Sequence, residues 1–518
     1  MRAPARFFSW FLFFAILFLR KFAWAQDSQT GVVAGIEEPP RTSDANGNEN
    51  PERLFRDVRI GARARPKFGN AEAVLDTQFG GALLRIPLLD QGVRPEDAEF
   101  KLGRFYLDVR SVSGSLLYSD NINLESENRK DGFIGITRLR MAALFQLNDN
   151  LRLSVAGTLV YLPFENKIGI AGFGVEDILA QFENQTLAHA QMTYDFNLGD
   201  WHTELYDDFR VRLGRFGESE ELFDGSTFDE EDRAGRYTFR DTTQTRHSRL
   251  GDSFIESRNI VGFSTDRLLP TETRLEFGAN RSDFWYQGER GGFLPSSRDL
   301  AYVSLSSERE NLRFKPYTDY RVFRYSNDPF SQQVVVGFQG PITENLELLG
   351  EVGYFESGRS DQGTHIWRAR LGHTISPLAY HELGYVRRVT QPDQDIEDSL
   401  SYLLRRSLGP TAQAEVYAVA SRFDDMDDNR SSSDEFRAGT RFSFLVAEGT
   451  ILRLSGTYAK IDYDDNIYGD REQWIAQMGV RRNSLEGRFF YRYVAVSETA
   501  TRDHYHENLF GLTVTKYF

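Results

Sequence analysis

The sequence predicts an all-β fold, a transmembrane antiparallel meander β-barrel of about 20 strands, within a range of roughly 16 to 22. Three observations predict it. The last residues alternate between apolar and polar side chains and end on Phe518, as the closing strand of an outer-membrane barrel does. An apolar N-terminal segment indicates export from the cytoplasm. Between the two ends, pairs of long alternating segments recur, joined by short polar turns.

Residues 1–25 have the three parts of a secretory signal peptide. Two arginines precede a mostly apolar run from Phe7 to Leu19, and residues 23–25 (AWA) supply the small residues that signal peptidase recognises. Because a membrane helix needs about 20 apolar residues, this run is too short to be an anchor. We therefore expect secretion with cleavage near Gln26 and a location in the cell outer membrane.

Two further segments precede the barrel. Residues 26–52 are rich in Pro, Gly, Asn and acidic residues and hold little that could form a core, so we expect a disordered periplasmic leader. Residues 53–102 contain short strand-like pieces broken by proline and glycine. They are compatible with a lead-in, a lumen plug or extra strands. The barrel itself is expected from residue 103 to residue 518.

From residue 103 onward the chain is organised as hairpins. The first strand and the first two hairpins are expected at Phe105–Ser119, Phe133–Leu147 with Leu151–Tyr161, and Leu187–Leu198 with Trp201–Leu213. Later hairpins are expected to start near Arg258, Leu300, Gln332, His365, Leu400, Asp434 and Glu472. With a first and a last strand the total is even, as single-chain bacterial barrels require. Short turns are then periplasmic, and the longer loops are external.

Composition excludes other classes. The 518 residues include no cysteine, so neither disulfides nor thiolate metal sites are expected. The signal segment holds 4 of the 61 basic residues and no acid, so 57 basic residues face 76 acidic ones, a net charge of −19. Nucleic acid is therefore not an expected partner. Aromatic residues make up 14% of the chain, which suits a barrel whose alternate residues face lipid and water.

Sorting strand residues by alternation assigns arginine-rich faces to the lumen. In residues 434–445, Phe436 and Phe442 share one face, while Arg437 and Arg441 share the other. The same sorting predicts a pore lining of Arg138, Arg140, Arg152, Arg210, Arg212, Arg274, Arg313, Lys315, Arg321, Arg368, Arg370, Arg437, Arg441, Arg453, Arg481, Arg488 and Arg492. The acids sorted to the same faces are Glu204, Glu276, Asp319, Glu347, Glu351, Glu415 and Glu486. By this sorting the lumen is electropositive, although the chain is acidic.

An electropositive lumen has two interpretations, which the sequence leaves open. Rings of Arg and Lys in a pore favour anions. Alternatively, the same arginines pair with acids across strands and hold the wall in shape. Our leading hypothesis is a porin-like channel for diffusion of small anionic solutes, since so wide a barrel is not filled by its own side chains. An exporter of an anionic polysaccharide and a non-conducting structural or adhesion barrel are the alternatives.

Other expected partners follow from the surface. Phe510, Leu512, Val514 and Phe518 share one face of the last strand and form an assembly signal for the barrel assembly machinery. Outer-membrane lipid and lipopolysaccharide would surround the barrel, and divalent cations could bridge lipopolysaccharide to acidic loops such as residues 424–429 (DDMDDN) and 462–470 (DYDDNIYGD). We expect no cofactor, no resident metal and no catalytic residues, and therefore no enzyme.

One short motif carries a resemblance. Residues 114–122 (GSLLYSDNI) contain Tyr118, Asp120, Asn121 and Ile122 in a Y-x-D-N-I pattern at the end of the first strand. This resembles a feature found early in the beta-barrel porin family of Gram-negative outer-membrane proteins, and the hairpin series to the C-terminus is similar to that family's barrel. The resemblance implies an outer-membrane barrel and supplies no catalytic residues. Lys516 departs from the apolar residue that is usual near the end of such barrels.

Overall fold

The computed structural model describes most of the chain from residue 98 onward. The described residues are 98–122, 129–148, 150–165, 167–170, 185–215, 253–288, 293–309, 311–326, 328–360, 362–389, 395–409, 411–426, 432–447, 449–464, 470–497 and 504–518. The chain divides into units Met1–Arg56 and Asp57–Phe518, and every described residue belongs to the second. The predicted signal peptide, the leader and most of the 53–102 segment lie outside the described residues.

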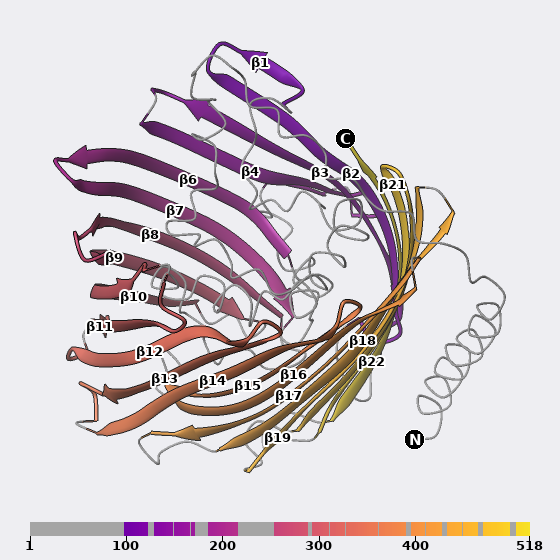
Figure 1. Cartoon of the computed structure of the whole chain (residues 1–518). Helices are drawn as coiled ribbons and strands as arrows, with labels where there is room; N and C mark the ends of the chain where they lie inside the picture. The colour runs from indigo at the N-terminus through magenta and orange to yellow at the C-terminus, as the bar shows by residue number, and fades with distance from the viewer. Residues whose placement is uncertain are drawn as a thin grey trace, which may run out of the picture. The chain divides into compact units, whose positions relative to one another are not determined.

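Within the described residues every regular element is a β-strand (Figure 1). The strands are β1 (Phe100–Leu102), β2 (Phe105–Ser119), β3 (Gly132–Gln146), β4 (Leu151–Leu162), β5 (Lys167–Ile170), β6 (Gln185–Leu198), β7 (Trp201–Arg215), β8 (Ser253–Leu268), β9 (Thr273–Gly288), β10 (Phe293–Ser307), β11 (Lys315–Tyr325), β12 (Ser331–Thr343), β13 (Leu346–Glu356), β14 (Gly363–Ser376), β15 (Ala379–Val389), β16 (Asp395–Gly409), β17 (Ala412–Asp425), β18 (Ser433–Ala447), β19 (Thr450–Tyr463), β20 (Arg471–Arg482), β21 (Leu485–Val496) and β22 (Tyr505–Tyr517). No helix in this part of the chain is long and apolar enough to cross a bilayer.

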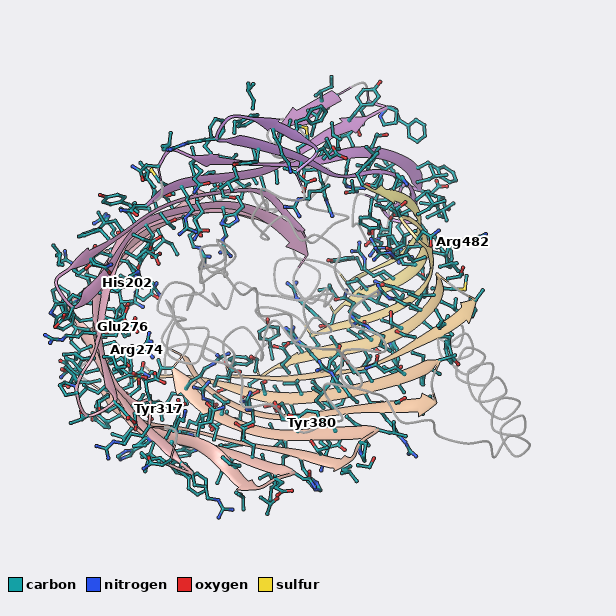
Figure 2. All side chains as sticks on the ribbon, turned by 45° about the horizontal axis from the view of Figure 1, so that its top comes forward. His202, Arg274, Glu276, Tyr317, Tyr380 and Arg482 are labelled. Carbon is teal, nitrogen blue, oxygen red and sulfur yellow. The ribbon has the colours of Figure 1, made fainter. Side chains whose placement is uncertain are left out.

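The strands close into one antiparallel ring. Consecutive strands pair from β2 onward, except that β4 pairs with β6, and β22 returns to β2 with registers from Ser111–Tyr517 to Ser119–Leu509. The short strand β1 pairs with the start of β2, and β5 pairs with the end of β4. Neither interrupts the ring. Of the 22 strands in the sheet, 20 therefore form the wall, which confirms the predicted meander barrel. Figure 2 shows the strands running round in this ring.

Local turn chemistry explains the predicted hairpins. The β3–β4 turn is closed by the Asn148 side chain, whose Oδ1 accepts the amides of Asn150 and Leu151 at 2.8 and 2.6 Å. Gly199 in the β6–β7 turn has a φ of 62°, a conformation that favours glycine. The short turns lie at one end of the ring, together with the start of β2 and the end of β22. The longer connections lie at the other end, which we call the long-loop end.

The outer face of the ring is apolar between two aromatic girdles. Exposed aliphatic side chains such as Val336 and Leu512 occupy its middle. Aromatic pairs flank this belt, among them Phe105 with Phe145 at the short-turn end and Tyr118 with Phe133 at the long-loop end. Along β18 the distance from Phe436 to Phe444 is about 27 Å of strand at 3.4 Å per residue. A tilted strand of that length suits the roughly 25 Å apolar band of a transmembrane barrel.

Tyrosines on the inner face cover glycines of neighbouring strands. A Cβ atom on Gly337 of β12 would meet Tyr317 of β11 at 2.5 Å, and one on Gly439 of β18 would meet Tyr417 of β17 at 2.5 Å. The Tyr317 hydroxyl reaches on to donate to Glu351 of β13. Because only glycine leaves room for the ring, these pairs join adjacent strands through close packing.

The inner wall as the candidate functional site

Inward positions of nearly every strand carry charged or polar side chains, as the alternation predicted. Figure 2 labels His202, Arg274 and Glu276 on one side of the ring. In β18 the inward positions hold Arg437 and Arg441, whereas Phe436 points outward. The chemistry of the site is therefore set by which charges meet across neighbouring strands.

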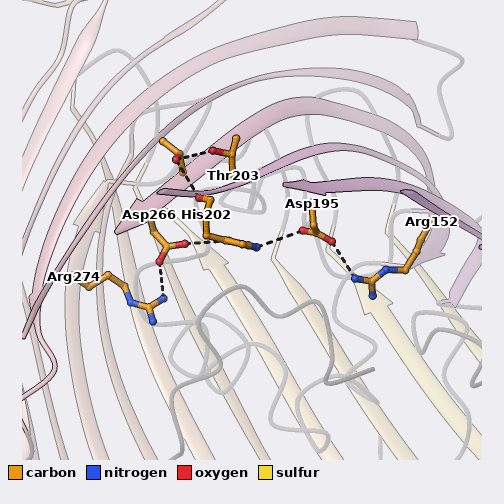
Figure 3. A network of polar contacts seen from close by, with 7 residues as sticks. Arg152, Asp195, His202, Thr203, Asp266 and Arg274 are labelled. Carbon is orange, nitrogen blue, oxygen red and sulfur yellow. Dashed lines mark hydrogen bonds and ion pairs between the residues drawn. The ribbon is translucent and has the colours of Figure 1, made fainter. Parts of the chain in front are cut away.

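A network of alternating charges occupies the inner wall over β4 and β6 to β9, towards the short-turn end (Figure 3). Arg152 Nη2 lies 3.0 Å from Asp195 Oδ2, and Asp195 Oδ1 lies 3.9 Å from His202 Nε2. His202 Nδ1 lies 3.3 Å from Asp266, whose other oxygen is 3.3 Å from Arg274 Nη1. Each carboxylate is flanked by basic groups, so this region joins strands and offers no concentrated charge. In the described part of the chain, no three His, Cys, Asp or Glu side chains are placed to hold a metal ion.

Cross-strand ion pairs continue round the wall. Arg368 on β14 faces Glu351 on β13 in the register and donates to it from Nε and Nη2 at 2.5 and 2.7 Å. Arg405 on β16 faces Glu415 on β17 at 2.9 Å. Such bidentate and directly opposed pairs hold neighbouring strands in register. Over a substantial part of the inner face, arginines therefore pair with acids across strands and hold the wall in shape.

Three arginines lie near one another where the ring closes. The inner faces of β2 and β22 present hydroxyls here, and Arg138 Nη1 donates to Ser115 Oγ at 2.9 Å, which in turn contacts Thr513 Oγ1 at 2.9 Å. Arg140 on the same strand and Arg488 on β21 act electrostatically on Arg138. Arg138 is only 4% exposed, whereas Arg140 and Arg488 are half-buried. We call Arg138, Arg140 and Arg488 the seam arginines.

The structure places the predicted pore-lining residues in distinct settings. Those that form ion pairs with an acid include Arg152, Arg210, Arg274, Arg368, Arg437 and Arg492. Also at inward strand positions are Arg138, Arg140, Lys315, Arg321, Arg370, Arg441, Arg453, Arg481 and Arg488. Arg313 precedes β11, is exposed, and donates to the Pro341 carbonyl at 2.7 Å. Arg212 lies in β7, with its side chain outside the described residues. Their pore-lining role stays a prediction.

Sequence sorting missed inward residues of both signs, arginines such as Arg258, Arg298 and Arg405 as well as several acids. Asp208 lies 2.9 Å from Arg210, and Glu435 contacts Arg437 on the same strand. Other inward acids that were missed are Asp195, Asp266, Glu382, Glu397 and Glu507. The sequence could have identified these acids as inward, because residues two apart on a strand share a face, as Asp208 and Arg210 do.

The Tyr118-to-Ile122 motif lies at the closing seam. Asp120 accepts the Asn508 backbone amide at 2.7 Å and its side-chain amide at 2.6 Å. Asn121 is fully buried and donates to the His506 carbonyl at 2.8 Å. The Tyr118 ring lies between Phe133 and Phe510, 4.9 and 6.4 Å away. The motif thus joins the end of the first strand to the start of the last.

Three of the predicted assembly-signal residues, Phe510, Leu512 and Val514, lie on the outer face of β22, and Phe518 directly follows the strand. All four are exposed. Lys516 occupies the same face, and its ammonium lies 5.9 Å from the centre of the Phe518 ring. The Lys516 side chain has a long apolar part that can lie in the bilayer while its ammonium group reaches the water at the membrane edge. This arrangement is compatible with a strand that spans the membrane.

No family model and no curated protein matches the sequence. Among solved structures, the chain is similar to the ferric-catecholate import receptor Fiu of E. coli K12, with 7% identity, 79% of this chain and 81% of that chain covered, and a TM-score of 0.40. The alcaligin outer-membrane receptor FauA of Bordetella pertussis shares 9% identity over 78% and 76%, with a TM-score of 0.37. OmpT of Vibrio cholerae, expressed in the outer membrane, shares 11% over 81% and 99%, with a TM-score of 0.30. The closed ring, the apolar outer belt and the charged inner wall themselves define the class, a wide transmembrane β-barrel.

Proposed function

We propose that the protein is an outer-membrane channel, porin-like, through which small anionic solutes diffuse. The apolar belt and its aromatic girdles support insertion in a bilayer. A ring of 20 strands is wider than the small barrels whose side chains fill their interiors, so it encloses water unless a segment fills it. The proposal is one of transport and assigns no catalytic step.

The seam arginines carry the proposed selectivity. Arg140 and Arg488 act electrostatically on Arg138, which lies beside the hydroxyls of Ser115 and Thr513. An acid lies close by as well, because Glu486 accepts a hydrogen bond from Tyr517, on which Arg140 and Arg488 also act. A concentration of positive charge next to hydrogen-bond donors lowers the free energy of an anion in the pore.

Export of an anionic polysaccharide is the second candidate. The same site combines guanidinium groups, which bind carboxylates, with hydroxyls such as those of Ser115 and Thr513, which suit sugar hydroxyls. An exporter would bind such a polymer, whereas a diffusion channel would pass small anions without a strong site.

Single-channel recording of the refolded mature protein in a planar bilayer tests the proposal. We expect steady openings whose reversal potential in a KCl gradient shows preference for chloride. The variant Arg140→Gln/Arg488→Gln should lose that preference, whereas Arg313→Gln, in an exposed turn, should retain it. Absence of conductance from a folded barrel, or cation selectivity, would contradict the proposal. Block of the current by low concentrations of oligogalacturonate would instead favour the exporter.

A further inference from the structure

A groove of about 330 Å³ crosses the outer face of the barrel from β15 to β19. Its apolar residues include Leu400, Ala420 and Phe436, and its charged residues include the cations Arg422 and Lys460 and the carboxylates Asp398, Asp434 and Asp462. We call it the outer groove. It faces away from the inner wall, so the proposed transport does not account for it.

The residues of the outer groove change from apolar to charged at one level across three strands. In the register, Ala420 of β17 lies opposite Phe436 of β18, and two residues further towards the loops Arg422 lies opposite Asp434. On β16, Leu400 lies opposite Ala420, and Asp398 lies opposite Arg422, so β16, β17 and β18 leave the apolar belt at the same register. On β19 the change comes one step earlier, because Lys460 lies opposite Phe436.

Aromatic side chains identify this change from apolar to charged residues as the edge of the bilayer. Tyr458 and Trp474 pack with ring centres 4.2 Å apart, and Tyr458 lies 6.2 Å from Phe436. Tyrosine and tryptophan gather at the membrane–water interface. The charged side of the outer groove lies just beyond this girdle, at the depth of lipid headgroups, where charges on the lipid face cost little.

Exposed cations and carboxylates alternate on the charged side. Arg422 is 56% exposed and its Nε lies 3.1 Å from Asp424. Lys460 is 44% exposed and its Nζ lies 2.6 Å from Asp462. Exposed ion pairs of this kind contribute little to folding. Their guanidinium and ammonium groups remain accessible from the lipid side, together with carboxylates that can bind divalent cations.

We propose that the outer groove binds the phosphorylated headgroup of an outer-leaflet glycolipid. Phosphate oxygens contact Arg422 and Lys460, while the lipid's divalent counter-ions contact Asp434 and Asp462. Acyl chains lie over Leu400 and the other apolar residues of the groove. The proposal rests on the proposed outer-membrane location and on the orientation expected from the sequence, with the long-loop end facing the cell exterior.

Native mass spectrometry of the full mature protein in detergent micelles, titrated with diphosphoryl lipid A and Mg²⁺, tests the proposal. We expect the variant Arg422→Gln/Lys460→Gln to bind about 10- to 30-fold more weakly, at roughly a three- to fivefold loss per cation. The matched control Arg406→Gln, on the outer face at the short-turn end, should stay within about twofold of the parent. Heat-modifiable gel migration checks that each variant is folded.

Further measurements distinguish the contributions of the lipid phosphates, of divalent cations and of free inorganic phosphate. EDTA should weaken lipid A binding to the parent protein but have little effect on Asp434→Asn/Asp462→Asn. A dephosphorylated lipid A should bind weakly, and inorganic phosphate should not compete at equal concentration. Equal affinity of the parent and of Arg422→Gln/Lys460→Gln, or equal binding of the dephosphorylated lipid, would overturn the proposal, as would competition by inorganic phosphate. Because binding is measured without conductance, a barrel that binds lipid A but passes no current would contradict only the proposed channel.

Discussion

Replacing Glu507 with alanine should strongly destabilise the barrel at its seam. Glu507 and Arg492 are 1% and 2% exposed, with Arg492 Nη2 3.3 Å from Glu507 Oε2. Ser119 of β2 also donates to Glu507 Oε1 at 2.9 Å, so one carboxylate links three strands. Removing one partner of a buried pair leaves a desolvated charge and costs about 3–5 kcal/mol. That corresponds to about two to four powers of ten in the folding equilibrium constant.

Urea unfolding of the refolded protein in phospholipid vesicles, followed by tryptophan fluorescence, measures this free energy. The control is Lys167→Ala, which removes an exposed pair with Glu165, 54% and 38% exposed, and should change stability by less than about 1 kcal/mol. The double variant Arg492→Ala/Glu507→Ala should be more stable than Glu507→Ala, because it leaves no unpaired charge. If Glu507→Ala were as stable as the control, the reasoning about the seam would be refuted.

Two further changes test the wall and the motif. Gly337→Ala should cost about 1–3 kcal/mol by urea unfolding, since its Cβ would meet Tyr317 at 2.5 Å, whereas Gly487→Ala, with nothing within 4 Å, should cost much less. Equal costs at the two glycines would contradict the packing argument. Asp120→Ala should slow the appearance of the heat-modifiable folded band in a refolding time course, because it removes two hydrogen bonds to Asn508. Unchanged refolding kinetics and stability would argue against a role of the motif in closing the ring.

The positions of the strands could be predicted because each strand carries its own signal. Phe105–Ser119 agrees with β2 at both ends, and Leu151–Tyr161 differs from β4 by one residue. Alternation, turn residues and length are local properties, and a transmembrane strand must be long enough to cross the bilayer. The strand count followed from counting hairpins, which needs no long-range information.

The charge balance of the inner wall could not be predicted in the same way. Glu415 faces Arg405 on one side and Arg441 on the other, a relation set by the registers of two strand pairs. Arg313 was sorted to the lumen, yet β11 begins only at Lys315 and Arg313 contacts the Pro341 carbonyl. Alternation identifies a face but not which residue on the next strand lies opposite. The register decides which arginine lies opposite which acid, and therefore where the charges cancel.

By itself, the sequence determined that the chain is an all-β barrel, where its hairpins lie and which faces are apolar, because these depend on periods and turns within a few residues. Only the tertiary structure decided that Asp120 meets Asn508 and Arg492 meets Glu507 across the closing seam. It also decided that Arg422 and Lys460 share one groove on the outer face. These contacts join residues far apart in the chain, or on strands whose relative shift is set by closure of the whole ring, and no local pattern encodes that shift.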